Sequence, residues 1–209
     1  CIKLKMWYNI HTKIFVQEVY GMKDQLSCSE ITKRKIAAAL KELMQTTPFE
    51  KITVSDISNK CEMHRQTFYY HFQDRYELLD WLLYNEIISK LVENFSYETM
   101  EENFLTLFNT MYNDKKFYQN AVKINMGDVY SYLSKVAINQ FEKIIKEVIK
   151  KNYLSPISDD QSAIAEFFGF GLGGVIISWV DKGMKETPQE MANKVKSFVE
   201  QIRIIVSKK

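Results

Sequence analysis

The chain has 209 residues, 46% of them hydrophobic and 26% charged, and its formal net charge at pH 7 is only +2. This composition excludes a disordered tail and a uniformly basic nucleic-acid coat, and the length is sufficient for one large or two small domains with a sizeable core. Any affinity for DNA must therefore come from a local group of basic side chains. No membrane partner is expected, because no stretch reaches the roughly 18 apolar residues of a membrane span.

The first 21 residues, CIKLKMWYNIHTKIFVQEVYG, alternate Lys with aromatic and aliphatic residues. They lack the uninterrupted apolar core and the small-residue cleavage site of a signal peptide. Met22 is one candidate for the natural start, because polar residues after it lead into the first strong helical pattern. We assign residues 1–28 to an N-terminal extension, and residues 1–21 of it are either foreign to the protein, a native extension, or a basic arm on DNA.

Helical patterns begin at Ser29. The first carries an apolar stripe that ends before Thr46-Thr47-Pro48 and consists of Ile36, Ala37, Leu40, Leu43 and Met44. In the next segment Thr53 is a natural N-cap with Asp56 as its capping-box partner. A tight turn and a second short helix follow, in which Phe68 and Phe72 lie four residues apart and face the core.

This pair of short helices has the form of a helix-turn-helix. The second helix has an outward face of basic, amide, hydroxyl and aromatic side chains, made of Arg65, Gln66, Tyr69, Tyr70 and His71. Because the major groove admits a helix whose end carries hydrogen-bond donors, these side chains are available for a partner such as DNA.

The remainder of the chain also predicts helices. Asp74 caps one that has Glu77 in the capping-box position and is expected to run to about Phe95. The later ones are expected at 99–113, 115–123, 129–151, 159–182 and 188–207. The last has Thr187 as N-cap, Pro188 in its first turn and Glu190 in the capping position. With no convincing strand in the sequence, the expected fold class is all-α.

The run TVSDISNKCEMHRQTFYYHFQDRYELLDWL resembles the DNA-binding signature of the TetR/AcrR family of bacterial regulators, and the resemblance covers about residues 31–83. It implies a three-helix DNA-binding domain at residues 29–76 and a helical effector-binding and dimerisation domain at 77–209. Three positions depart from the family pattern: Glu62 replaces a turn Gly, His64 a small hydroxyl residue, and Gln66 a frequent Gly. Glu62 puts the turn geometry in question, because non-Gly residues rarely adopt the left-handed conformation.

The resemblance also implies which residues contact DNA. Arg65 and Gln66 stand where the family reaches base edges, and an Arg can fork onto guanine and a Gln onto adenine. Tyr69 and Arg75 are expected to bind phosphates, the latter where the family often has a Lys. The full expected set is Thr53, Arg65, Gln66, Thr67, Tyr69, Tyr70, His71 and Arg75.

For the C-terminal part, the resemblance implies a homodimer and a small-molecule effector or sensor partner. The expected dimer face is the last two helices, and the candidate ligand residues are Phe104, Phe108, Tyr112, Phe141, Phe168 and Trp179. The implied function is a cytoplasmic regulator that binds a palindromic double-stranded operator as a homodimer, with repression expected more than activation. The RQTFYYHF helix is also similar to a subgroup that includes a regulator of dihydroxyacetone kinase genes, in which a companion protein senses the ligand and the regulator activates.

Other chemistries find little support in the sequence. Gly169, Gly171 and Gly174 fit G-x-G-x-x-G, but a helical pattern precedes them where a dinucleotide site needs a strand, so no cofactor is expected. Close helix approach, against a partner subunit or beside a ligand cavity, is the expected reason for these glycines.

Cys61, His64 and His71 match no zinc spacing, and no metal site is expected. The odd set of three cysteines argues against a disulfide framework and for a reducing compartment. No catalytic constellation is present, so we do not expect an enzyme. The alternative function is a helical small-molecule or protein-binding module that does not read DNA.

Overall fold

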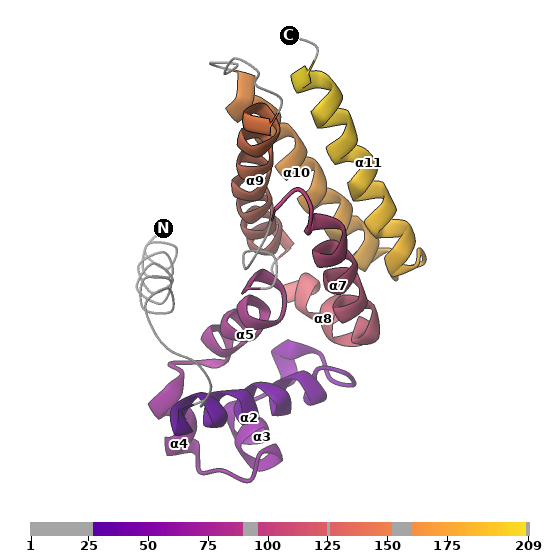
Figure 1. Ribbon diagram of the computed structural model, residues 1–209. Coiled ribbons are helices and arrows are strands. Elements are labelled where there is room, and N and C mark those ends of the chain that lie inside the picture. Colours follow the sequence, from indigo (N-terminus) through magenta and orange to yellow (C-terminus); the bar gives the residue numbers. More distant parts are fainter. Residues whose placement is uncertain (1–26, 90–95, 125, 152–159, 208–209) are drawn as a thin grey trace. The chain divides into compact units, whose positions relative to one another are not determined.

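A computed structural model of the protein describes residues 27–89, 96–124, 126–151 and 160–207 (Figure 1). These residues form helices and turns and contain no strand, which confirms the all-α prediction. Residues 1–26, most of the expected extension, lie outside the described residues. The first described helix begins at Cys28, one residue before the predicted start of the DNA-binding domain.

The N-terminal helices match the predicted order. They are α2 (Cys28–Leu43), the 3₁₀ turn η1 (Phe49–Lys51), α3 (Val54–Lys60), α4 (Arg65–His71) and α5 (Arg75–Leu83). Their apolar stripes are buried: Ile36 and Leu40 of α2 and Ile57 of α3 are fully enclosed, and Phe68 of α4 is 1% exposed. The periodic positions singled out in the sequence therefore form the core of this part.

The helix after Asp74 differs from its prediction. It is α-helical only to Leu83 and continues as a π-helical segment, η2 (Tyr84–Ile88), and residues 90–95 lie outside the described residues. The Asp74 side chain accepts hydrogen bonds from the backbone of Tyr76 and Glu77, as expected of a cap. Glu77, however, accepts from the Gln73 backbone and not from that of Asp74.

Among the described residues from 96 onward there are five helices, within a few residues of their predicted bounds. They are α7 (Met100–Asn113), α8 (Lys115–Ile124), α9 (Met126–Lys151), α10 (Asp160–Asp181) and α11 (Pro188–Ser207). Helix α10 packs extensively against α9, and α11 packs against α7 (Figure 1). The Thr187 cap of α11 is present, because the Thr187 hydroxyl accepts from the Glu190 backbone and Glu190 accepts from that of Thr187.

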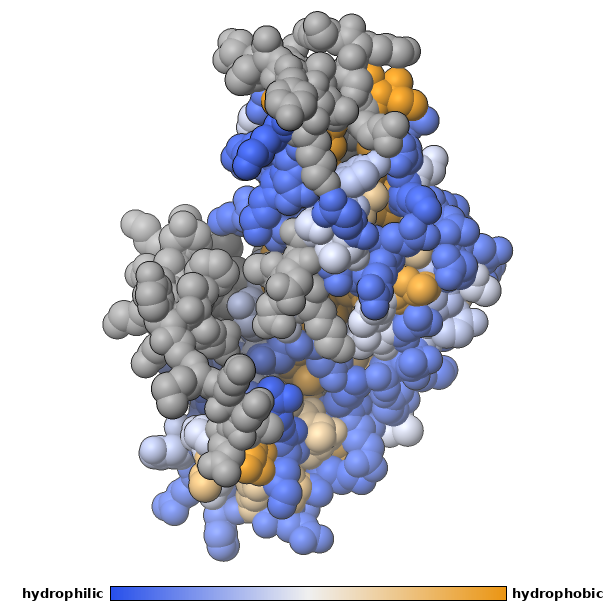
Figure 2. Space-filling model, viewed as in Figure 1, coloured by the Kyte–Doolittle hydropathy of each residue, from blue (hydrophilic) through white to orange (hydrophobic). Residues whose placement is uncertain are grey.

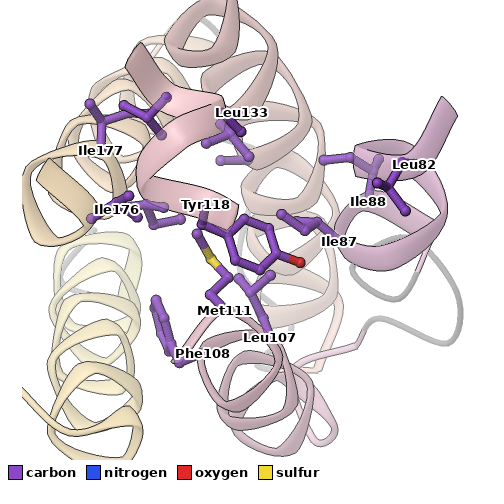
Figure 3. Close-up of a cluster of buried hydrophobic side chains, with 14 of the residues drawn as sticks. Leu82, Ile87, Ile88, Leu107, Phe108, Met111, Tyr118, Leu133, Ile176 and Ile177 are labelled. Carbon is purple, nitrogen blue, oxygen red and sulfur yellow. The ribbon is translucent and has the colours of Figure 1, made fainter. Parts of the chain in front are cut away.

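The buried side chains of this part belong to one apolar cluster with those of α2 to α5. Within this cluster, Tyr118 of α8 lies between side chains of four other elements (Figure 3). Ile87 comes from η2, Met111 from α7, Leu133 from α9 and Ile176 from α10. In Figure 3 the Tyr118 hydroxyl points to the side where Ile87 lies. The face of the molecule seen in Figure 2 is mainly hydrophilic, with scattered apolar side chains.

Two glycines explain how α10 packs on α9. A Cβ atom at Gly169 would lie 2.3 Å from Ile138 Cγ1 and 2.7 Å from the Ile138 backbone nitrogen, and one at Gly173 would lie 2.3 Å from Ser134 Oγ. Of the glycines singled out in the sequence, Gly169 therefore makes the expected close approach, but to a helix of the same chain. Gly173 was not singled out. Gly171 differs, since no atom of another described element lies within 4 Å of its hypothetical Cβ.

Helix α10 is also the most apolar of the described helices. By length and composition alone, Gln161–Asp181 is the one candidate for a membrane span among the described residues, contrary to the expectation that no stretch would qualify. Of its apolar window, 44% is buried inside the protein. Because Ala165, Leu172, Ile176 and Val180 are buried, we interpret this character as that of a core helix.

Candidate nucleic-acid interface

The first helix of the helix-turn-helix, α3, starts at a complete capping box. The Thr53 hydroxyl accepts from the Asp56 backbone nitrogen at 3.2 Å, and Asp56 Oδ2 accepts from the Thr53 backbone nitrogen at 2.8 Å. The Thr53 hydroxyl also donates to Asp56 Oδ2 at 2.6 Å. These bonds lower the pKa of Asp56, with the side-chain bond from Thr53 as the largest cause and the backbone bond next. The predicted cap is confirmed.

The turn between α3 and α4 contains a left-handed residue. Glu62 has a φ of 56°, and the Met63 backbone nitrogen donates to the Ser58 carbonyl oxygen at 2.9 Å. The chain therefore makes the expected turn although Glu62 stands where the resembled family has Gly. This conformation strains a residue with a Cβ atom by about 1 kcal/mol or more.

Helix α4 separates its inward and outward side chains sharply. Phe68 and Phe72 are buried, at 1% and 2% exposure, while Tyr69 is 50% and Tyr70 82% exposed. Arg65 and Gln66 are also exposed, and Thr67 and His71 are half-buried. The structure thus presents Arg65, Gln66, Tyr69 and Tyr70 on the surface of a single helix, as an interface with a groove requires.

Arg65 and Tyr69 interact across one turn of α4. Arg65 Nη2 donates to the Tyr69 hydroxyl at 3.4 Å, and the guanidinium carbon lies 6.0 Å from the centre of the Tyr69 ring. This contact orients the guanidinium group at the exposed surface. The remaining donors of the Arg fork suit a base edge or a phosphate.

Arg75 has a structural role that the sequence did not reveal. Its Nη1 donates to the carbonyl oxygens of Phe49 at 2.8 Å and Glu50 at 3.1 Å, and also to that of Ile52. The guanidinium carbon lies 5.4 Å from the centre of the Tyr76 ring. Arg75 therefore holds the segment just before the Thr53 cap, and phosphate binding by Arg75 stays a prediction. Because its partners are backbone carbonyls, no residue pattern in the sequence signals this contact.

Two of the six candidate ligand residues line a small cavity among the described residues. A cavity of about 10 Å³, room for a single water molecule, is lined by Phe104, Leu133, Val136, Ala137, Gln140, Phe141, Leu172 and Ile176. Phe104 and Phe141 thus line it, and Phe168 packs on Phe141 with ring centres 6.0 Å apart. Trp179 instead contacts Phe108 and Tyr112, at ring-centre distances of 5.4 and 6.5 Å.

Gln140 was not singled out in the sequence. It is 5% exposed, and its Oε1 is a buried acceptor without a hydrogen-bond partner in the part of the chain that the structure describes. In the same part, no group of three or more His, Cys, Asp or Glu side chains is placed to hold a metal ion.

The fold and the exposed helix agree with comparisons with known proteins. The chain is 33% identical over 121 residues to the HTH-type dhaKLM operon transcriptional activator DhaS of Lactococcus lactis subsp. lactis (strain IL1403), which covers 58% of this chain and 62% of that relative. A solved structure described as dihydroxyacetone kinase operon activator DhaS superimposes with a TM-score of 0.72 and 26% identity, covering 83% of this chain and 97% of the other.

A further solved structure shares the fold alone. It is described as a TetR-family transcriptional regulator from Rhodococcus sp., with a TM-score of 0.52 and 13% identity, and covers 82% of this chain and 98% of the other. Two family models match successive parts of the chain. Residues 36–82 match the bacterial regulatory proteins of the tetR family, and residues 98–201 match a transcriptional regulator C-terminal region. The chain therefore belongs to the TetR family of transcriptional regulators, which are DNA-binding proteins and not enzymes.

Proposed function

We propose that the protein reads a specific double-stranded operator by inserting α4 into the major groove. The observation that supports this most is the exposed set Arg65, Gln66, Tyr69 and Tyr70 on a helix held by the capped α3 and the left-handed turn. Arg65 and Gln66 read base edges, and Tyr69 contacts a phosphate. Thr53, Thr67, His71 and Arg75 border this surface and complete the proposed interface.

The proposed operator is palindromic because the protein acts as a homodimer through α10 and α11. On α10, Phe167 is 74% and Phe170 47% exposed, and open space lies over Gly171. We name these three residues the exposed α10 face. Large exposed apolar side chains beside a position that accepts close approach are typical of a protein interface.

We further propose that the regulator activates transcription, although the family at large favours repression. Support comes from the two DhaS relatives, both of which are described as activators. Control acts through residues 77–209, by a small-molecule effector or by a sensor protein, and the protein works in the cytoplasm.

Selection of bound sequences from a random duplex pool, at two salt concentrations, tests DNA reading. We expect one enriched palindrome and an affinity that falls steeply with salt, because phosphate contacts release counterions. A variant with Arg65→Ala and Gln66→Ala should enrich a degenerate site under the same conditions. Absence of enrichment by the wild type at both salt concentrations would favour the alternative, a helical binding module that does not read DNA.

A further inference from the structure

One side chain of α8 bonds to three backbone groups around the start of the helix-turn-helix. Asn120 Nδ2 donates to the carbonyl oxygens of Met44 at 3.1 Å and Thr47 at 2.7 Å. Asn120 Oδ1 accepts from the Phe49 backbone nitrogen at 3.0 Å. A helix of the C-terminal part thus satisfies the polar backbone groups of the segment that joins α2 to η1.

A second set of polar contacts lies nearby. Lys41 Nζ, on α2, bonds to both carboxylate oxygens of Glu86 at 2.7 and 2.8 Å and to Asp114 Oδ2 at 2.7 Å. The Tyr118 hydroxyl donates to Glu86 Oε2 at 2.9 Å, and Gln45 Nε2 donates to Asp114 Oδ1 at 3.3 Å. We name the residues Lys41, Glu86, Asp114, Tyr118 and Asn120 the polar joint.

The π-helical segment places Glu86 in this joint. Because η2 accommodates five residues in one wide turn, it directs Ile87 and Ile88 into the core and Glu86 toward Lys41 and Tyr118. Single π turns inside α-helices occur frequently at functional sites. The irregular stretch of the helix is thus the stretch that contacts α2 and α8 through one carboxylate.

Loss of one contact in the polar joint should destabilise the others, because its charged groups are partly buried. The Lys41, Glu86 and Asp114 side chains are only 19%, 24% and 31% exposed, so each charge needs its partners. Burial lowers the pKa of Lys41, but the hydrogen bonds to Asp114 and Glu86 outweigh it and leave that pKa raised. Burial, with Glu86 nearby, raises the pKa of Tyr118, so its hydroxyl stays a donor at neutral pH.

We propose that Asn120, Lys41, Glu86 and Tyr118 are positioning residues for operator reading, which fix residues 35–76 on the helices of the C-terminal part. Resting on the proposed function, this inference adds that the joint sets the spacing between the two α4 helices of a dimer. The operator spacing that the protein accepts is then decided at these contacts, far from the bases.

The test uses the full chain and the palindrome found by selection. Duplexes carry the two half-sites with the centre shortened or lengthened by one base pair, which moves a half-site by about 3.4 Å and about a tenth of a turn. For the wild type, we expect affinity to fall at least about tenfold at either altered spacing.

Asn120→Leu removes three hydrogen bonds at similar volume, and Tyr118→Phe removes a single hydroxyl. Both variants should lose less than about threefold at the altered spacings, while their affinity for an isolated half-site stays within about twofold of wild type. Lys116→Ala, at an exposed position on the same helix, is the matched control and should keep the wild-type preference.

The outcomes separate the two proposals. Folded variants that keep the wild-type spacing preference overturn the positioning role, whatever their affinity. If Asn120→Leu does not fold, Tyr118→Phe decides the question alone, because an unchanged preference in that variant is sufficient to overturn it. If the wild type binds no duplex specifically, the proposed function fails first and the joint has no role in reading.

Discussion

The guanidinium carbon of Arg75 lies 4.8 Å from the centre of the Phe49 ring, and Arg75 Nη1 donates to the Phe49 carbonyl oxygen at 2.8 Å. One side chain thus stacks on a core aromatic residue and holds the segment that leads into α3. The planar guanidinium group suits this combination, and the compact ammonium of a Lys does not. We therefore expect Arg75 to contribute to DNA reading by shaping the protein, whether or not it contacts a phosphate.

Replacement of Arg75 by Ala should destabilise the fold by about 1.5–3 kcal/mol, the usual range for hydrogen bonds from a charged group. Arg75→Lys should restore little of this loss. Operator affinity should weaken for all sequences in both variants. Thermal unfolding and binding at several salt concentrations measure both effects. A salt slope reduced by about one with unchanged stability would instead make Arg75 a pure phosphate ligand.

Arg65→Ala should reduce operator affinity by about 1–3 kcal/mol and relax the preference at one position of each half-site, because a bidentate contact to guanine is lost. Tyr69→Ala should weaken binding to specific and random duplexes alike, since a phosphate contact carries no sequence information. Competition binding against single-position operator variants distinguishes the two patterns. Equal losses on specific and random duplexes for Arg65→Ala would remove it from base reading.

Phe167→Glu should raise the dimer dissociation constant at least about tenfold. Because the dimer has two-fold symmetry, the substitution buries one carboxylate from each subunit in the proposed interface. Sedimentation at several concentrations measures the change. Tyr70→Ala is the converse control: its residue is 82% exposed on α4, so that variant should stay dimeric and lose DNA affinity. A fully dimeric Phe167→Glu protein would place the dimer contact elsewhere.

Gly169→Ala should destabilise the protein by about 1–3 kcal/mol, because the added methyl group overlaps both the backbone and the side chain of Ile138. Gly174→Ala is a matched substitution on the same helix, where the new Cβ would lie 3.7 Å from the Tyr130 ring. That change should stabilise by about 0.5–1 kcal/mol, through helix propensity alone. Denaturant unfolding of both variants checks the opposite signs.

Acid should weaken the start of α3. The folded-state pKa of Asp56 is lowered from its ordinary value of 3.8, so its capping contribution is fully present above about pH 4 and is lost as pH falls through the lower folded value. Asp56→Asn should abolish this part of the pH dependence. The free energy of unfolding of both proteins is measured between pH 2 and pH 6. The same pH dependence in both would show that protonation of Asp56 does not affect the cap.

Local signals in the sequence were sufficient for the helices. The caps at Thr53, Asp74 and Thr187 and the apolar spacing of Phe68 and Phe72 predicted helices that the structure contains, since caps and amphipathic stripes act over three or four residues. They also predicted which side of α4 is exposed.

Contacts distant in sequence were not predictable in the same way. The π turn at Tyr84–Ile88 leaves no periodic mark, and the partners of Arg75 and Asn120 are main-chain atoms, which every residue carries. The glycine-rich stretch predicted close approach, but not that Gly169 would meet Ile138 and leave Gly171 open. Aromatic side chains in the middle of the chain predicted candidate ligand residues, but the sequence did not predict that Phe104 and Phe141 would line a small cavity while Trp179 packs on Phe108.

The π segment also limits how this regulator can be recombined with its relatives. Each helical residue turns the chain by about 100°, so a graft that gains or loses one residue between Asp74 and Ser89 would rotate Glu86 away from Lys41. A chimera carrying a foreign DNA-binding domain should therefore be spliced ahead of Tyr84 with the residue count preserved. The transplanted domain should also have a Lys at the position of Lys41, so that it can form the ion pair with Glu86.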